Sequence, residues 1–169
     1  MANSENQGSG QQPWPLHAIQ LVDLRVEHLS ITAHVEVDRS EEPGAFSFET
    51  ASNEYDPEES QIRVRARIRI GLTDEAEDDS DLGEPDPEAP YVMVVSLVGI
   101  FQVDAERFPI EHIDHWAKRN APLILYPYLR EHALSLSVRA GFPQMLLPLL
   151  EMPSFRILPP AKASENKVQ

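Results

Sequence analysis

The sequence predicts an α+β fold, with a four-stranded antiparallel sheet followed by a long helix and a short C-terminal helical segment. Two observations support this prediction. Up to Val103 the apolar residues recur mostly at every second position, as they do in strands with one buried face. From Pro109 onward the period becomes helical, and strands followed by helices are typical of α+β proteins. The 169 residues are enough for one domain with a single core.

We expect three regions along the chain. Residues 1–15 form a polar, disordered N-terminal tail, residues 16–152 form the single domain, and residues 153–169 form a C-terminal tail. Residues 74–90 are predicted to be an acidic loop inserted in the domain. They hold nine of the 28 acidic residues and no Lys or Arg, so the net charge without them would be −5 instead of −14.

The first predicted strand covers residues 16–38. Its apolar positions change parity between Val26 and Leu29. Such a change would turn the apolar side chains to the wrong face of a sheet unless an extra residue were inserted. We therefore predict a bulge at Glu27–His28.

The second and third predicted strands cover residues 45–50 and 61–73. Phe46 and Phe48 share one face of the second strand. In the third strand, apolar residues alternate with four arginines, which are Arg63, Arg65, Arg67 and Arg69. Strict alternation predicts one buried face and one solvated face. The arginine face could instead bind an acidic partner or be covered by the acidic loop.

The fourth predicted strand covers residues 91–103. Its residues are apolar on both parities, which indicates a central strand or one buried against a partner chain. Gly99 indicates a kink or a close approach of another element.

Two helices are predicted next, over residues 109–118 and 123–140, and Gly141 ends the second. Pro127 is expected in or near the first turn of the long helix, where its missing N–H costs least. This helix is apolar nearly all round, which is more than one small sheet can cover. Part of it is therefore predicted to lie in a subunit interface. The predicted interface residues are Leu123, Ile124, Tyr126, Tyr128, Leu129, Leu134 and Leu136.

The composition excludes several classes of protein. There are no cysteines, so disulfides, thiol catalysis and cysteine-ligated zinc are excluded, and a reducing, cytoplasmic compartment is expected. The N-terminus does not look like a signal peptide, and no apolar run approaches the roughly 18–20 residues of a membrane span. The net charge of −14 disfavours binding to nucleic acids and to anionic membranes.

Neither a cofactor site nor an active site is predicted. His112 and His115 are spaced three apart, beside Glu111 and Asp114, but no third metal ligand completes a motif. A solvated helix face is the preferred interpretation of these residues. The sequence has no nucleophile–base motif, P-loop or dinucleotide-binding glycines, so we do not expect an enzyme.

Three stretches of the chain resemble the SecB chaperone family. Residues 120–131, Asn-Ala-Pro-Leu-Ile-Leu-Tyr-Pro-Tyr-Leu-Arg-Glu, resemble the start of that family's long helix. Residues 139–144 resemble the end of the helix and the loop after it, and residues 99–101 fit the fourth strand. The order of elements agrees over residues 16–150.

The resemblance implies that sheets pair into dimers and that two dimers sandwich their long helices into a homotetramer. It also implies ATP-independent binding of unfolded polypeptides, either in protein export or in the protection of aggregation-prone antitoxins. Export-type members dock the SecA motor on carboxylates of the sheet face. The matching positions here read His28, Thr32 and Val94, so SecA docking stays an open alternative. Pro153 and Pro159 leave little room for the family's last helix.

A chaperone of this kind needs exposed, adaptable apolar surface. The predicted client-binding residues are Phe46, Phe48, Phe142, Met145, Leu146, Leu147, Leu149, Leu150 and Met152. Any of them could instead belong to the core or to a subunit interface. The alternative function is a scaffold or regulatory protein that binds one folded partner.

Overall fold

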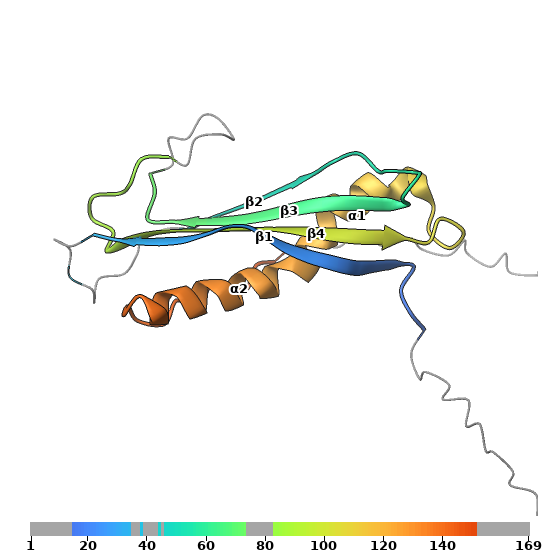
Figure 1. Ribbon diagram of the computed structural model, residues 1–169. Helices are drawn as coiled ribbons and strands as arrows, with labels where there is room; N and C mark the ends of the chain where they lie inside the picture. The colour runs from blue at the N-terminus through green and yellow to red at the C-terminus, as the bar shows by residue number, and fades with distance from the viewer. Residues whose placement is uncertain (1–14, 35–37, 39–43, 45, 74–82, 152–169) are drawn as a thin grey trace, which may run out of the picture.

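A four-stranded sheet and a long helix along one of its faces make up the fold (Figure 1). The computed structural model describes residues 15–34, 38, 44, 46–73 and 83–151. The predicted fold class is confirmed. The predicted C-terminal tail, nearly all of the N-terminal tail and residues 74–82 of the acidic loop lie outside the described residues, so the domain boundaries stay a prediction.

The sheet has the strand order β1-β4-β3-β2, and every neighbouring pair is antiparallel. The strands are β1 (Ile19–Ala33), β2 (Phe46–Ser52), β3 (Gln61–Ile70) and β4 (Tyr91–Val103). β4 lies between β1 and β3, which confirms its predicted central place. Its two faces are largely buried, and this accounts for apolar residues on both parities.

β1 is interrupted by two bulges. The register against β4 shifts between Val26 and His28, so Glu27 is the extra residue and the predicted bulge is confirmed. A second shift between Leu21 and Asp23 was not predicted. Each shift returns the following apolar residues to the same face of the sheet.

The two faces of the sheet differ in chemistry, as the alternation in β3 predicts. The apolar residues of β3 are buried on the face that α2 covers. The arginines occupy the opposite face, here called the open face. There Arg63 lies opposite Ile100, and Arg69 lies opposite Val94. Both β4 side chains are buried. The long apolar stems of the neighbouring arginines can cover them.

Two helices follow the sheet. The predicted helix 109–118 is a 3-10 turn, η1 (Ile110–His112), followed by α1 (Ile113–Arg119). The long helix, α2, spans Ala121–Arg139 and begins two residues earlier than predicted. Pro127 therefore lies in the second turn, which corrects the expectation of a place near the first turn. Its missing N–H leaves the carbonyl of Leu123 without the usual helical partner.

α2 approaches the sheet closely at Gly99. A Cβ atom on Gly99 would lie 2.7 Å from Leu125 Cδ2 and 2.9 Å from Phe101 Cε2. The close approach predicted at this glycine is thus confirmed. It allows Leu125 and Leu129 to reach the centre of the core, where both are fully buried.

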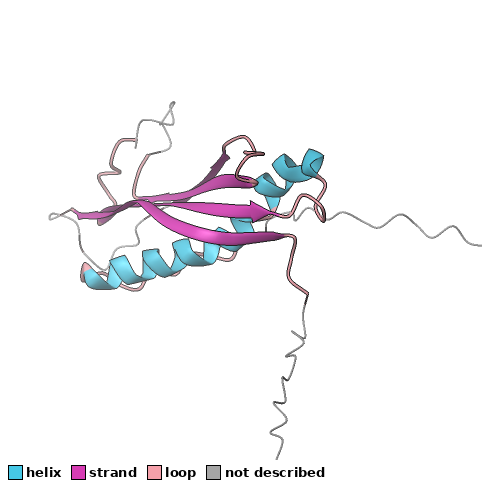
Figure 2. Cartoon of the chain, turned by 45° about the vertical axis from the view of Figure 1, so that its right-hand side comes forward, coloured by secondary structure: helices cyan, strands magenta, loops and turns pink. Residues whose placement is uncertain are grey.

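No helix follows α2 in the described residues 142–151 (Figure 2). The expected short C-terminal helical segment is therefore absent from this part of the chain. Pro143 and Pro148 each lack a backbone N–H, and each disfavours helical geometry in the residue before it.

Candidate functional site

Residues 142–151, here called the C-terminal segment, return along α2. Gly141 makes the turn with a φ of 79°, a conformation that glycine adopts without steric cost. Beyond the turn, the Met145 N–H donates to Ser137 Oγ over 3.0 Å, and that hydroxyl donates to Leu134 O over 3.0 Å. Ser137 is fully buried, so these bonds satisfy a polar group that water cannot reach.

Two more side chains of α2 hold the C-terminal segment by its carbonyls. The Tyr126 hydroxyl donates to Pro148 O over 2.6 Å, and Arg130 Nε donates to Leu147 O over 3.0 Å. Burial raises the pKa of Tyr126, although the charge of Arg130 lowers it in part, so the hydroxyl stays protonated as a donor. Later residues of the segment contact earlier residues of α2, so the two run antiparallel.

The C-terminal segment turns apolar side chains both inward and outward. Leu147 is 1% exposed and belongs to the core, whereas Leu146 is 61% exposed and Leu149 is 82% exposed. Met145 and Leu150 are partly buried against the core. The segment therefore presents two leucines to the outside while its backbone is held against α2.

The other predicted client-binding residues lie in two places. Phe46 and Phe48 are partly buried on the helix side of β2. The centroid of the Phe48 ring lies 5.2 Å from that of the Tyr126 ring. Tyr126 thus connects β2 to the C-terminal segment. Phe142 is buried, and its ring centroid lies 4.6 Å from that of Tyr91. Met152 lies outside the described residues.

The predicted interface residues of α2 divide into three groups. Leu123, Ile124 and Tyr128 are exposed. Tyr126 and Leu129 are buried within the chain, and Leu134 and Leu136 are partly buried. The roles assigned to the interface residues and to the client-binding residues stay predictions.

β1 carries an apolar surface that the sequence reasoning did not single out. α2 lies mainly over β3 and β4, so it leaves the helix side of β1 largely uncovered. Val26 and Leu29 are exposed there, opposite Leu97 and Val95 of β4. The signal was present in the sequence, because the predicted bulge already placed both residues on the apolar face.

On the open face, Glu27 of β1 binds side chains of β3 and β4. Its carboxylate lies 2.7 Å from Arg65 Nε and accepts hydrogen bonds from Arg65 Nη2 at 3.0 Å and Ser96 Oγ at 2.8 Å. Burial alone would raise the pKa of Glu27. The Ser96 and Arg65 hydrogen bonds and the charges of Arg65 and Arg67 outweigh burial, so the pKa lies below its ordinary 4.5.

Replacing Glu27 with glutamine should lower the free energy of unfolding by about 1 kcal/mol at neutral pH, a small value because the pair is more than a third exposed. The folded-state pKa is depressed, so this contribution exists above the ordinary pKa of 4.5 and is lost as the pH falls through the folded value. Urea unfolding of both proteins across this pH range would measure the difference, which should shrink in acid.

Glu106→Gln, in an exposed turn, is the matched control and should change the pH profile little. An equal loss for Glu27→Gln at every pH would contradict the ion-pair explanation.

The described residues hold neither a cluster of metal ligands nor a helix that could cross a membrane. Among the described residues, no group of three His, Asp or Glu side chains could hold a metal ion. His112 ends η1 and His115 lies in α1, and both have interaction partners. In the described part of the chain, no helix is both long and apolar enough to cross a membrane.

Comparison with known sequences identifies the family. The family described as "Preprotein translocase subunit SecB" matches residues 18–155. Proteins named "Protein-export protein SecB" are 40% identical over 60 residues in Thioalkalivibrio sulfidiphilus, 21% over 136 residues in Ehrlichia chaffeensis and 26% over 144 residues in Methylobacillus flagellatus. The first match covers 36% of this chain and 34% of the relative. The second covers 77% and 65%, and the third covers 85% and 83%. The chain therefore spans less than two thirds of the first two relatives.

A solved structure shares the fold. It is the SecB-like chaperone Rv1957 of Mycobacterium tuberculosis, in complex with a ChAD peptide from the HigA1 antitoxin Rv1956. The TM-score is 0.57 at 20% identity, and the match covers 80% of this chain and 93% of the other. With the family matching most of the chain and the fold agreeing with its sheet and long helix, the chain belongs to the SecB family.

Proposed function

We propose that this protein is an ATP-independent chaperone that holds unfolded polypeptides in the cytoplasm. The observation that carries the proposal is the C-terminal segment, which exposes Leu146 and Leu149 beside α2. Exposed apolar side chains attract unfolded chains without reading their sequence. Membership of the SecB family supports the same function, and the proteins of this family are not enzymes.

The chemistry of the segment suits varied clients. Met145 and the leucines are flexible enough to repack around different apolar side chains. The partly buried Phe46 and Phe48 extend the apolar surface to β2 by way of Tyr126. A client would bind over this joint surface through many weak contacts.

Two client classes follow from the names of the relatives. The sequence relatives are named protein-export proteins, which points to preproteins. The structural relative binds a peptide of an antitoxin, which points to aggregation-prone regulatory proteins. Restoration of export in a SecB-deficient strain would select the first class, and failure to restore it together with protection of an antitoxin would select the second.

SecA is a further partner to test on the open face. Three positions of this chain match the carboxylates on which export-type members dock SecA. Val94 is buried, His28 and Thr32 are exposed, and none of the three is a carboxylate. Direct binding of SecA to this chain, measured by light scattering, would decide whether the open face serves export.

The decisive test of the proposed function is the suppression of aggregation. A chemically denatured client is diluted into buffer with an equimolar amount of the protein, and turbidity is followed over time. We expect suppression for several unrelated clients without added ATP. Failure with all of them, together with a pull-down dominated by one folded protein, would favour the scaffold function instead.

The proposal includes a homotetramer built as a dimer of dimers. The uncovered apolar side of β1, with Val26 and Leu29, would be covered by a second chain. The exposed residues Leu123, Ile124 and Tyr128 of α2 would be covered by a second dimer. Both surfaces are apolar, as are the fully buried centres of stable interfaces.

Changing Ile124 and Tyr128 together to glutamate should dissociate the tetramer into dimers. Each new carboxylate would have to be buried without a partner, which is strongly unfavourable. Light scattering coupled to size-exclusion chromatography should show the mass halved. The control is Lys118→Glu/Arg119→Glu on the exposed side of α1, which should leave the mass unchanged. An unchanged mass for the α2 variant would contradict the predicted helix interface.

A further inference from the structure

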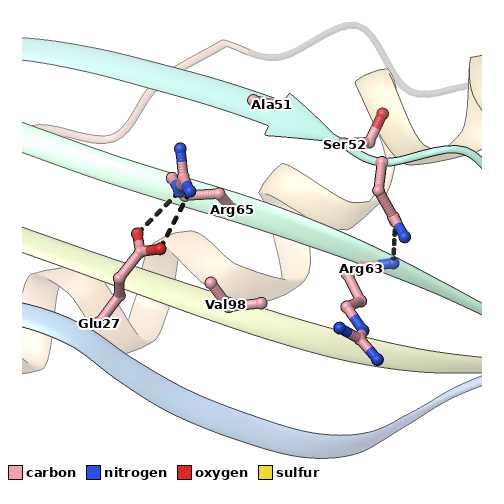
Figure 3. Close-up of a pocket in the computed structure, with 7 residues that line it drawn as sticks. Glu27, Ala51, Ser52, Arg63, Arg65 and Val98 are labelled. Atoms are coloured by element: carbon pink, nitrogen blue, oxygen red, sulfur yellow. Dashed lines mark hydrogen bonds and ion pairs between the residues drawn. The ribbon is translucent and has the colours of Figure 1, made fainter. Parts of the chain in front are cut away.

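The open face of the sheet carries a row of cations with a regular spacing. Arg63, Arg65, Arg67 and Arg69 point to the same side of β3, on alternate residues. Residues two apart in a strand repeat at about 6.6 Å. Figure 3 looks onto this face, with the helices behind the sheet. The buried residues of α1 and α2 pack with the apolar residues of β3, on the other face of the sheet.

The charge of this face is opposite to that of the whole chain. Its described strand residues carry five arginines and three carboxylates, whereas the chain has a net charge of −14. The three carboxylates are engaged: Asp23 pairs with Arg25, Glu27 pairs with Arg65, and Glu49 pairs with Arg67 and Arg69. The local surplus is therefore positive.

Arg63 supplies part of that surplus next to a pocket. Among the described residues no carboxylate pairs with its guanidinium, which points away from the Glu27–Arg65 pair (Figure 3). Its backbone is fixed, because the Arg63 N–H donates to Asn53 Oδ1 over 2.7 Å. A pocket of about 410 Å³ lies beside it, lined by Glu27, Ala51, Ser52, Asn53, Arg63, Arg65 and Val98.

The pocket has the chemistry of a carboxylate site. A guanidinium donates two parallel hydrogen bonds to a carboxylate. The Ser52 hydroxyl and the Asn53 amide can add further donors, while Ala51 and Val98 provide apolar contact for the methylenes of a glutamate. Glu27 also lines the pocket, but Arg65 and Ser96 already satisfy its oxygens.

We propose that the open face binds an extended, acidic polypeptide segment of a partner, anchored by one carboxylate at Arg63. An extended peptide turns alternate side chains to one side with the same repeat as β3. A glutamate two residues from the one at Arg63 can therefore lie near Arg65, while Arg67 and Arg69 stay paired with Glu49. A phosphate backbone fits less well, because its anions lie on every unit and not on alternate residues of an extended strand. This surface is separate from the proposed client surface on the other side of the sheet.

The test uses fluorescence anisotropy with the full-length protein and labelled ten-residue peptides of alternating Glu and Thr, Gln and Thr, or Lys and Thr. Only the glutamate peptide should bind. Arg63→Gln should weaken its binding about fivefold, and Arg63→Lys should only partly restore it, because lysine lacks the planar fork. Arg139→Gln, which removes one exposed arginine at the end of α2, should have little effect.

Two outcomes would overturn the proposal. One is equal binding of the glutamate and glutamine peptides, or binding that Arg63→Gln leaves unchanged. The other is tighter binding of a single-stranded DNA of equal charge than of the glutamate peptide. The proposal is independent of the holdase function, because Arg63→Gln should leave the suppression of client aggregation unchanged.

Discussion

Replacing Gly71 with alanine should lower the free energy of unfolding by about 3–5 kcal/mol. Gly71 follows β3 with a φ of 70°, and an added Cβ would lie 2.1 Å from the carbonyl oxygen of Tyr91. That oxygen belongs to the backbone of β4, so it cannot move away as a side chain could. The loss should appear as a lower urea midpoint with an unchanged slope.

Gly44 provides a matched control for this change. It has a similar φ of 78°, but among the described residues the nearest atom to an added Cβ is Asp86 Oδ2 at 3.9 Å. Gly44→Ala would therefore suffer only the conformational cost, about 1 kcal/mol. Similar losses for the two variants would show that the clash with Tyr91 is relieved elsewhere in the sheet.

Changing Leu146 and Leu149 together to serine should weaken client binding about 100-fold or more. A leucine that becomes fully covered by a client contributes about 1.5–3 kcal/mol, and every 1.4 kcal/mol is a factor of about ten. Both side chains are exposed in the free protein, so its own stability should change by less than about 0.5 kcal/mol. Titration of a labelled, permanently unfolded client would measure the affinity.

The control variant, Leu146→Met/Leu149→Met, keeps the apolar surface and should bind the client nearly as well as the wild type. Unchanged affinity in the serine variant, with the thermal unfolding midpoint also unchanged, would remove the C-terminal segment from the client surface. The partly buried Phe46 and Phe48 would then be the next residues to vary.

The sheet was largely predictable because the pattern of apolar residues within each strand indicates which of its faces are buried. Alternation along β3 depends only on which side chains face the core, and β4 is apolar on both parities because both of its faces are largely buried. The bulge at Glu27 could be predicted from one change of parity. The bulge between Leu21 and Asp23 was missed, although Leu21 and Leu24 lie three residues apart on the same face.

The candidate site was less predictable because it depends on contacts between distant residues. The sequence marked residues 142–152 as apolar, but it could not show which leucines would be buried. That choice follows from the hydrogen bonds of Tyr126, Arg130 and Ser137 to the C-terminal segment. The segment has no regular period to indicate them, since Pro143 and Pro148 prevent a helix.

The way in which α2 holds the C-terminal segment has a consequence for how this region can change during evolution. Tyr126 and Arg130 donate to main-chain oxygens of residues 147 and 148, and every amino acid supplies the same oxygen. Substitutions at the exposed positions 146 and 149 would leave these anchors in place. The path of the segment is thus uncoupled from the identity of its outward side chains, so the preference for clients could diverge between relatives without any change in the fold.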